Sequence, residues 1–116
     1  MPEAYRLLGY VLMQLGESHK ARDSYAEAAN LGDDSAVMDA LRASYESETP
    51  EWTVQFSSRV AQALLNVEEK AEAELILLQA RSSVDPSLNF QAALEDLKDR
   101  FPNDDLIDDA IRMNNE

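Results

Sequence analysis

The chain has 116 residues, and its 23 acidic side chains outnumber its 10 basic ones, which gives a formal net charge of −13. This charge argues against binding to nucleic acid or to an anionic membrane surface; it is compatible with a basic partner, although solubility alone accounts for it. With no cysteine and a single histidine, His19, the chain lacks the residues for a disulfide, a thiolate metal site or a site with two histidine ligands.

Short helices dominate the predicted structure. The chain contains only three Gly and four Pro residues, and a sheet of short strands would need more turn formers than these. Between the breaks, apolar side chains recur every three or four residues, as on one face of an α-helix. The seven predicted helices cover, in chain order, residues 2–15, 19–30, 35–47, 51–65, 68–84, 87–100 and 105–113. Because the connecting turns are short, neighbouring helices should run antiparallel.

No targeting or membrane-spanning segment is visible. The longest run free of charge and strong polarity, residues 7–13, is far shorter than the ~20 residues that cross a bilayer. The chain opens on a helix-start pattern at Pro2 and Glu3, as a fragment of a longer protein would. The absence of cysteine suits the cytoplasm and the periplasm equally, so the compartment stays open.

The first two predicted helices alternate large and small side chains at fixed spacing. The large ones are Tyr5, Leu8, Leu12 and Tyr25, and the small ones are Gly9, Ala21 and Ala28. Small residues let two helices approach closely, and the large ones then fill the space between them. In this pattern, with Gly16 in the turn, residues 2–35 closely resemble a tetratricopeptide repeat, a helix-turn-helix unit of about 34 residues. Asp33 replaces the closing Pro of that family, and Leu12 stands where Tyr is more common.

A second, degenerate match to the same repeat covers residues 54–87. Ala73 and Ala80 take the places of small residues, but Ser57 stands at the first aromatic place. The two matches are further apart than one repeat length, so the third helix is either an insertion or half of a diverged repeat. Simple alternation would pair the third helix with the fourth and the fifth with the sixth. We prefer a pairing of the fourth with the fifth, because Pro50 and Pro86 bracket that hairpin.

The last third of the chain carries two further patterns. The centre of the fifth helix, residues 75–78, is apolar on every side, which predicts cover from more than one direction. Residues 88–116 are predicted to form two capping helices with a polar outer face. Four carboxylates lie close together there: Asp104, Asp105, Asp108 and Asp109. Because a calcium loop also needs a central Gly, we interpret them as a helix cap and an acidic first turn and predict no metal site.

The resemblance implies a groove for a protein partner. In that family, the first helix of each repeat lines a concave groove that binds a peptide or a helix. The matching positions in the first repeat are Glu3, Arg6, Tyr10, Met13 and Gln14. They share one helix face, although the alternative is that the third helix covers Tyr10 and Met13. The matching positions in the second repeat are Gln55, Ser58, Gln62 and Leu65. The family's clamp for a terminal carboxylate is not expected, because Tyr10 stands at its first Asn place.

Two other residues are unusual in this chain. A catalytic histidine needs an acidic partner and a nucleophile nearby, and no pattern around His19 supplies them, so we interpret it as a solvated surface residue. Trp52, the only tryptophan, follows Pro50 at a helix start, and we interpret it as a packing residue rather than one that stacks on a ligand.

Together these patterns predict a single all-α domain over residues 1–116, an antiparallel helix-turn-helix array of the tetratricopeptide-like α-solenoid type. Its predicted function is to bind a protein or peptide partner, with no catalysis and no cofactor. The predicted partner-binding residues are Arg6, Tyr10, Met13 and Gln14. The alternative is a self-associating assembly domain, in which an exposed apolar face pairs two copies.

Overall fold

A computed structural model describes all of residues 1–116 and contains eight α-helices and no strand. The helices are α1 (Pro2–Gln14), α2 (Ser18–Asn30), α3 (Ser35–Glu46), α4 (Pro50–Gln55), α5 (Ser57–Gln62), α6 (Val67–Val84), α7 (Phe90–Arg100) and α8 (Asp105–Asn114). The predicted all-α fold is confirmed. The outer ends of the seven predicted helices agree with those observed to within three residues.

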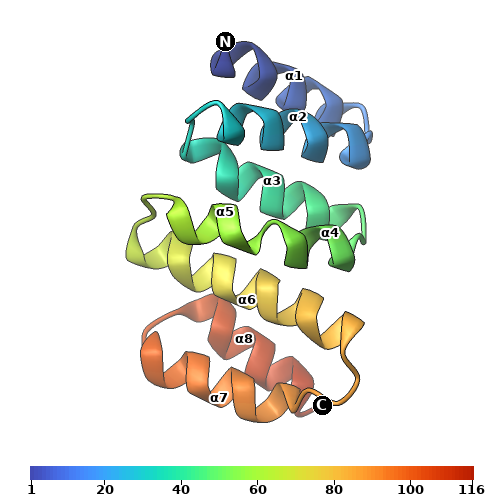
Figure 1. Ribbon diagram of the computed structural model, residues 1–116. Helices are drawn as coiled ribbons and strands as arrows, with labels where there is room; N and C mark the ends of the chain where they lie inside the picture. Colours follow the sequence, from blue (N-terminus) through green and yellow to red (C-terminus); the bar gives the residue numbers. More distant parts are fainter.

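Helices α1, α2 and α3, the pair α4 and α5, and α6 lie one below another in chain order, and the chain alternates in direction from layer to layer (Figure 1). Helices α4 and α5 lie end to end in one layer, and at the far end of the stack α8 lies between α6 and α7 in this view. The molecule measures 42 × 25 × 23 Å. In this stack α2 lies between α1 and α3, and α4 packs against both α3 and α6, with the more extensive contact to α6. The last two helices pack against each other and against α6. None of the eight helices is both long enough and apolar enough to span a bilayer.

The prediction of one continuous helix over residues 51–65 is wrong. The helix is interrupted at Phe56, whose buried ring stacks on Trp52 with the ring centroids 4.8 Å apart. It then ends early, because Ala63 turns into an extended conformation. There the Leu64 amide donates a hydrogen bond of 3.1 Å to the side chain of Asp34. A partner from a distant part of the chain thus takes the amide that a continuing helix would have used.

Small side chains bring α1 and α2 together as the sequence pattern predicts. Ala21 and Ala28 are fully buried, and the Tyr25 ring lies over Gly9. The prediction that Tyr5 and Leu8 fill the space between the two helices is wrong, because both side chains are exposed. The reason is the position of α1 at the end of the stack, where only α2 packs extensively against it (Figure 1).

Helix α6 belongs to two hydrophobic cores at once. Ile76 and Leu77 lie in a core built mainly from α2, α3 and α6. Leu75 and Leu78 lie in a second core with α7 and α8. All four side chains are buried, which confirms the prediction that the centre of this helix is covered from more than one direction.

Side-chain hydrogen bonds cap the N-termini of the last three helices, α6, α7 and α8. Asp104 caps α8 by accepting a hydrogen bond from the Ile107 amide, and Asn66 forms a reciprocal capping box with Glu69 at the start of α6. Helix α2 includes Ser18, because the carbonyl of Glu17 already accepts the first helical hydrogen bond. Helix α2 therefore begins one residue earlier than its sequence indicates.

Candidate functional site

Arg6 joins α1 to the start of α3. Its Nη1 atom donates a hydrogen bond of 2.8 Å to the Ser35 hydroxyl and lies 3.2 Å from a carboxylate oxygen of Asp33. The Ser35 hydroxyl and amide donate to the other oxygen of Asp33. The hydrogen bond from the Ser35 hydroxyl, assisted by Arg6, holds the pKa of Asp33 below its ordinary value. The guanidinium is thus half-exposed and yet fixed in direction.

The other predicted partner-binding residues of α1 differ in exposure. Tyr10 is 57% exposed. Gln14 and Glu3 are also exposed, whereas Met13 is half-buried and packs against the larger core. Of the two alternatives for this helix face, Met13 fits cover by neighbouring helices and Tyr10 fits an accessible surface.

The side chain of Tyr25, on α2, is buried close to residues of both α1 and α3. Three side chains lie near enough to shift the pKa of Tyr25: Arg6 and Tyr10 of α1, and Asp39 of α3. Burial raises the pKa of Tyr25, the carboxylate of Asp39 raises it further, and the positive charge of Arg6 lowers it. The predicted residues of α1 therefore share one region with charged residues of α3.

A bidentate ion pair between Arg42 and Glu72 extends this region to α6. The Nε and Nη2 atoms of Arg42 donate to the two carboxylate oxygens of Glu72, at 2.8 and 2.7 Å. The Nη1 atom of Arg42 also lies 3.8 Å from Asp39. Burial raises the pKa of Asp39, and the nearby charges of Arg42 and Arg6 oppose that shift.

These contacts define a surface that crosses three helices, which we call the ionic face. It consists of Arg6, Tyr10, Asp33, Asp39, Arg42 and Glu72. The sequence predicted its two members on α1. The others were missed as site residues, although Asp39 and Arg42 are three positions apart on α3 and therefore share a helix face. No sequence signal links Arg42 to Glu72, because they come from helices far apart in the chain.

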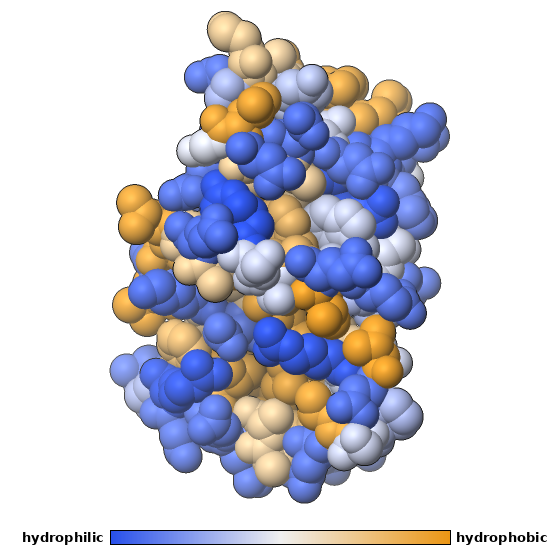
Figure 2. Space-filling view, in the orientation of Figure 1, coloured by the Kyte–Doolittle hydropathy of each residue, from blue (hydrophilic) through white to orange (hydrophobic).

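A second surface on α1 is apolar. Leu7, Leu8, Val11 and Leu15 are 65%, 47%, 43% and 70% exposed and recur along the outer side of the helix. We call these four residues the α1 apolar face; orange surface lies at this end of the molecule (Figure 2). Only Glu3 and Arg6 carry charge on α1. An exposed apolar surface of this kind in an otherwise acidic chain is typical of a contact surface.

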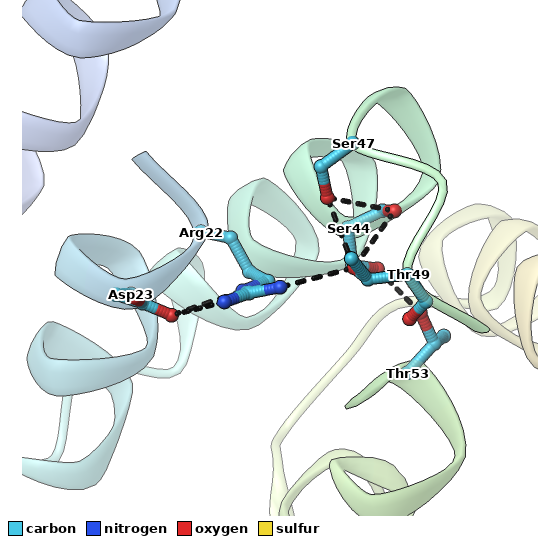
Figure 3. Close-up of polar contacts among 6 residues, drawn as sticks. All are labelled: Arg22, Asp23, Ser44, Ser47, Thr49 and Thr53. Atoms are coloured by element: carbon cyan, nitrogen blue, oxygen red, sulfur yellow. Dashed lines mark hydrogen bonds and ion pairs between the residues drawn. The ribbon is translucent and has the colours of Figure 1, made fainter. Parts of the chain in front are cut away.

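Trp52 packs inside the domain, as predicted. Its ring stacks on Phe56, and the guanidinium of Arg22 lies 5.0 Å from its centroid. Arg22 also donates hydrogen bonds to the Thr49 hydroxyl (3.1 Å) and to Asp23 (2.9 Å), as Figure 3 shows. This side chain ties α2 to the turn between α3 and α4.

Hydroxyl groups form a hydrogen-bond network around the turn between α3 and α4. The Thr53 hydroxyl donates to the buried Ser44 hydroxyl at 2.8 Å, and the Ser47 and Thr49 hydroxyls are 2.9 Å apart (Figure 3). Ser44 in turn donates to the Leu41 carbonyl. No buried side-chain polar atom lacks a hydrogen-bond partner, so this network holds the turn in place.

The acidic cluster near the end of the chain is divided among separate partners. Asp104 is the α8 cap, Asp108 pairs with Lys98 at 2.6 Å, and Asp109 pairs with Arg112. No group of three or more histidine and carboxylate side chains is placed to hold a metal ion. His19 is exposed on the first turn of α2 and has no ion-pair or hydrogen-bond partner on its side chain.

The predicted contact positions of the second repeat do not form one surface with those of α1. Gln55, Ser58 and Gln62 are exposed on α4 and α5, and Leu65 is half-buried in the following turn. Ser58 and Leu65 instead line a hollow beside α6. These residues therefore lie in a different environment from Arg6 and Tyr10.

Comparison of the chain with protein-family models, with curated proteins and with solved structures finds no match. The class that the fold defines is an all-α domain of stacked antiparallel helices.

Proposed function

We propose that the chain is a protein–protein interaction module with a tetratricopeptide-like arrangement of helices. The pattern of residues 2–35 supports this arrangement, since Gly9 lies against Tyr25, and Ala21 and Ala28 are fully buried. The module binds a peptide or a helix of a partner protein through α1, at Arg6, Tyr10, Met13 and Gln14.

The observation that carries this proposal is the exposure of Tyr10 within the ionic face. A tyrosine ring offers a large, rigid contact area and a hydroxyl for hydrogen bonding. In the same ionic face, Arg6 and Arg42 are held in fixed directions by their own carboxylate partners. Tyrosine and arginine are both enriched at protein contact surfaces.

The proposal includes no catalysis. Acid–base catalysis needs a titratable group beside a nucleophile or a substrate-sized cleft. His19 is exposed and unpartnered, and Asp39, whose pKa is raised, lies beside Arg42 rather than beside a nucleophile. These placements favour a binding role.

The test is affinity capture from extracts of the source cell with matched variants. We expect the double variant Tyr10→Ala, Gln14→Ala to lose partners that the wild-type chain recovers. Tyr45→Ala is the control, because Tyr45 is an equally exposed tyrosine, at 58%, on the opposite end of α3 from the α1 contact at Ser35. Circular dichroism checks that each variant is folded. Equal recovery by all three proteins would contradict the assignment.

A second candidate function is self-association, and the α1 apolar face favours it. Two copies that meet at this face bring together few charges, although each chain carries a net charge of −13. Sedimentation equilibrium separates the two candidates. A dimer that dissociates in Val11→Glu would support self-association, whereas a monomer at every concentration supports binding to a different protein.

A further inference from the structure

A groove lies where α5 and the end of α7 flank α6. Its volume is about 520 Å³. The apolar part of its lining consists of Val60, Ala61, Ala63, Leu65, Ala73, Leu77 and Phe101. We call it the α6 groove. Orange and deep-blue surface lie side by side over α6 and α7 in Figure 2, so apolar and strongly polar side chains meet in this part of the molecule.

The α6 groove contains the only two basic side chains that lack an acidic partner. Of the ten Lys and Arg residues, eight form an ion pair with a carboxylate. The remaining two are Lys70 and Arg81, and both line this groove. Arg100 lies on the same rim and is shared between Glu74 and Asp96, at 3.5 and 3.3 Å.

The lack of an ion-pair partner for Lys70 and Arg81 is unexpected, because acidic residues outnumber basic residues in the chain, at 23 against 10. Long basic side chains on an acidic surface readily find a carboxylate, as the other eight do. Lys70 and Arg81 instead extend beside apolar surface, and Glu74, the only acid in the lining, already faces Arg100. The groove thus combines an apolar floor with unneutralised positive charge.

We propose that the α6 groove binds an acidic segment of a partner protein, with an apolar side chain in the groove and carboxylates on Lys70 and Arg81. The two cations are on one face of α6, about 16 Å apart along the helix at ~1.5 Å per residue. An extended chain covers that distance in about five residues. The matching segment therefore carries two acidic residues about five positions apart, with a bulky apolar residue between them.

A separate partner suits this groove better than a second copy of the chain. Two copies that each carry a charge of −13 repel one another, whereas a short segment with a few carboxylates brings little charge. The inference does not depend on the role of α1, because the α6 groove contains no residue of that helix.

The test is fluorescence anisotropy with a dye-labelled synthetic peptide that has one central Leu between two Glu residues. We expect saturable binding to the intact chain at low salt and loss of binding at high salt, because the contact is partly ionic. The variant Lys70→Glu, Arg81→Glu should weaken binding at least tenfold. Ala61→Phe, which places a ring in the groove at an exposed position without changing charge, should weaken it as well.

Matched controls distinguish binding in the α6 groove from non-specific electrostatic attraction. Lys20→Glu, Arg112→Glu makes the same change in net charge at two exposed sites outside the groove and should alter the dissociation constant less than threefold. A peptide with Gly in place of Leu should bind at least tenfold more weakly. The proposal is overturned if the wild-type chain shows no saturable binding, or if both double variants weaken binding equally. It is also overturned if sedimentation shows that the wild-type chain forms a dimer that depends on Lys70 and Arg81. The variant Tyr10→Ala should bind this peptide normally, so the result is independent of the α1 surface.

Discussion

The ring of Tyr25 lies so close to Gly9 that a Cβ atom built on Gly9 would come within 2.8 Å of its Cδ1 and Cε1 atoms. Tyr25 is buried, so its ring has little freedom to move away. The contact sets how closely α1 approaches α2, and therefore how α1 presents Arg6 and Tyr10 beside α3.

Gly9→Ala should destabilise the domain. The clash with Tyr25 costs ~1–3 kcal/mol, as overpacking does elsewhere, and the better helix propensity of Ala recovers only about 1 kcal/mol. Urea denaturation followed by circular dichroism measures the difference. In a Tyr25→Ala background the ring is gone, so Gly9→Ala should there be neutral or stabilising. Equal destabilisation in both backgrounds would show that the close approach is not the cause.

Glu48→Gly should stabilise the domain. Glu48 is the only residue other than glycine with a positive φ, at 54°. That conformation costs a residue with a side chain ~1–2 kcal/mol, and the greater backbone freedom of glycine offsets part of the gain. We expect a net increase of up to about 1 kcal/mol in the free energy of unfolding. Glu46→Gly is the control, because Glu46 is an exposed helical residue, and this change should be destabilising.

Asp33→Asn and Asp39→Asn should change the pH dependence of stability in opposite directions. The pKa of Asp33 is lowered from 3.8 in the folded state, chiefly by the Ser35 hydroxyl, so its contribution is present above pH 3.8 and is lost as the pH falls through the folded pKa. Asp33→Asn should therefore be less stable than wild type at pH 7, with a difference that shrinks in acid.

For Asp39 the ionised carboxylate has the opposite effect on the free energy of unfolding. Burial raises its pKa above 3.8, so the ionised group opposes folding at neutral pH and ceases to do so as the pH falls through the raised pKa. Asp39→Asn should be the more stable protein at pH 7, and the difference should close below pH 3.8. Thermal unfolding of the three proteins between acidic and neutral pH checks both signs; a shift in the same direction for the two variants would contradict the opposite roles of the two carboxylates.

Arg22→Met should destabilise the domain by about 1–2 kcal/mol. The change removes the hydrogen bond to Thr49 and the cation–π contact with Trp52 while keeping much of the apolar stem. Trp52 is the only tryptophan, so its fluorescence reports directly on this contact. Arg112→Met removes an exposed ion pair on α8 and should cost less than about 0.5 kcal/mol. An unchanged Trp52 spectrum in Arg22→Met would contradict the structural role of Arg22.

Local sequence patterns were enough to predict the helices apart from the break at Phe56, because caps, breaks and apolar spacing act within a few residues. They also predicted the buried centre of α6, since four consecutive apolar residues leave no polar side for solvent. The early end of α5 was missed, because it depends on Asp34, about 30 residues away, binding the Leu64 amide. The exposure of Leu8 was missed for a related reason, since the pattern does not reveal that α1 has only one extensive neighbour.

The ionic face was predictable only in part. Arg6 and Tyr10 follow from their positions on α1, but their surroundings come from other helices. The pairing of Arg42 with Glu72 joins α3 to α6 and has no local signal in the chain. The α6 groove was missed for the same reason, because the lack of an ion-pair partner for Lys70 and Arg81 is visible only after the chain has folded.

The double burial of α6 has a consequence for how the domain comes apart. If either half of the molecule detached, one side of residues 75–78 would be open to water, at a cost of about 25 cal/mol for each Å² of apolar surface. Neither half can be released without this penalty. A single central helix thereby couples the two ends of a slender molecule, which should melt in one concerted step rather than fray from its tips.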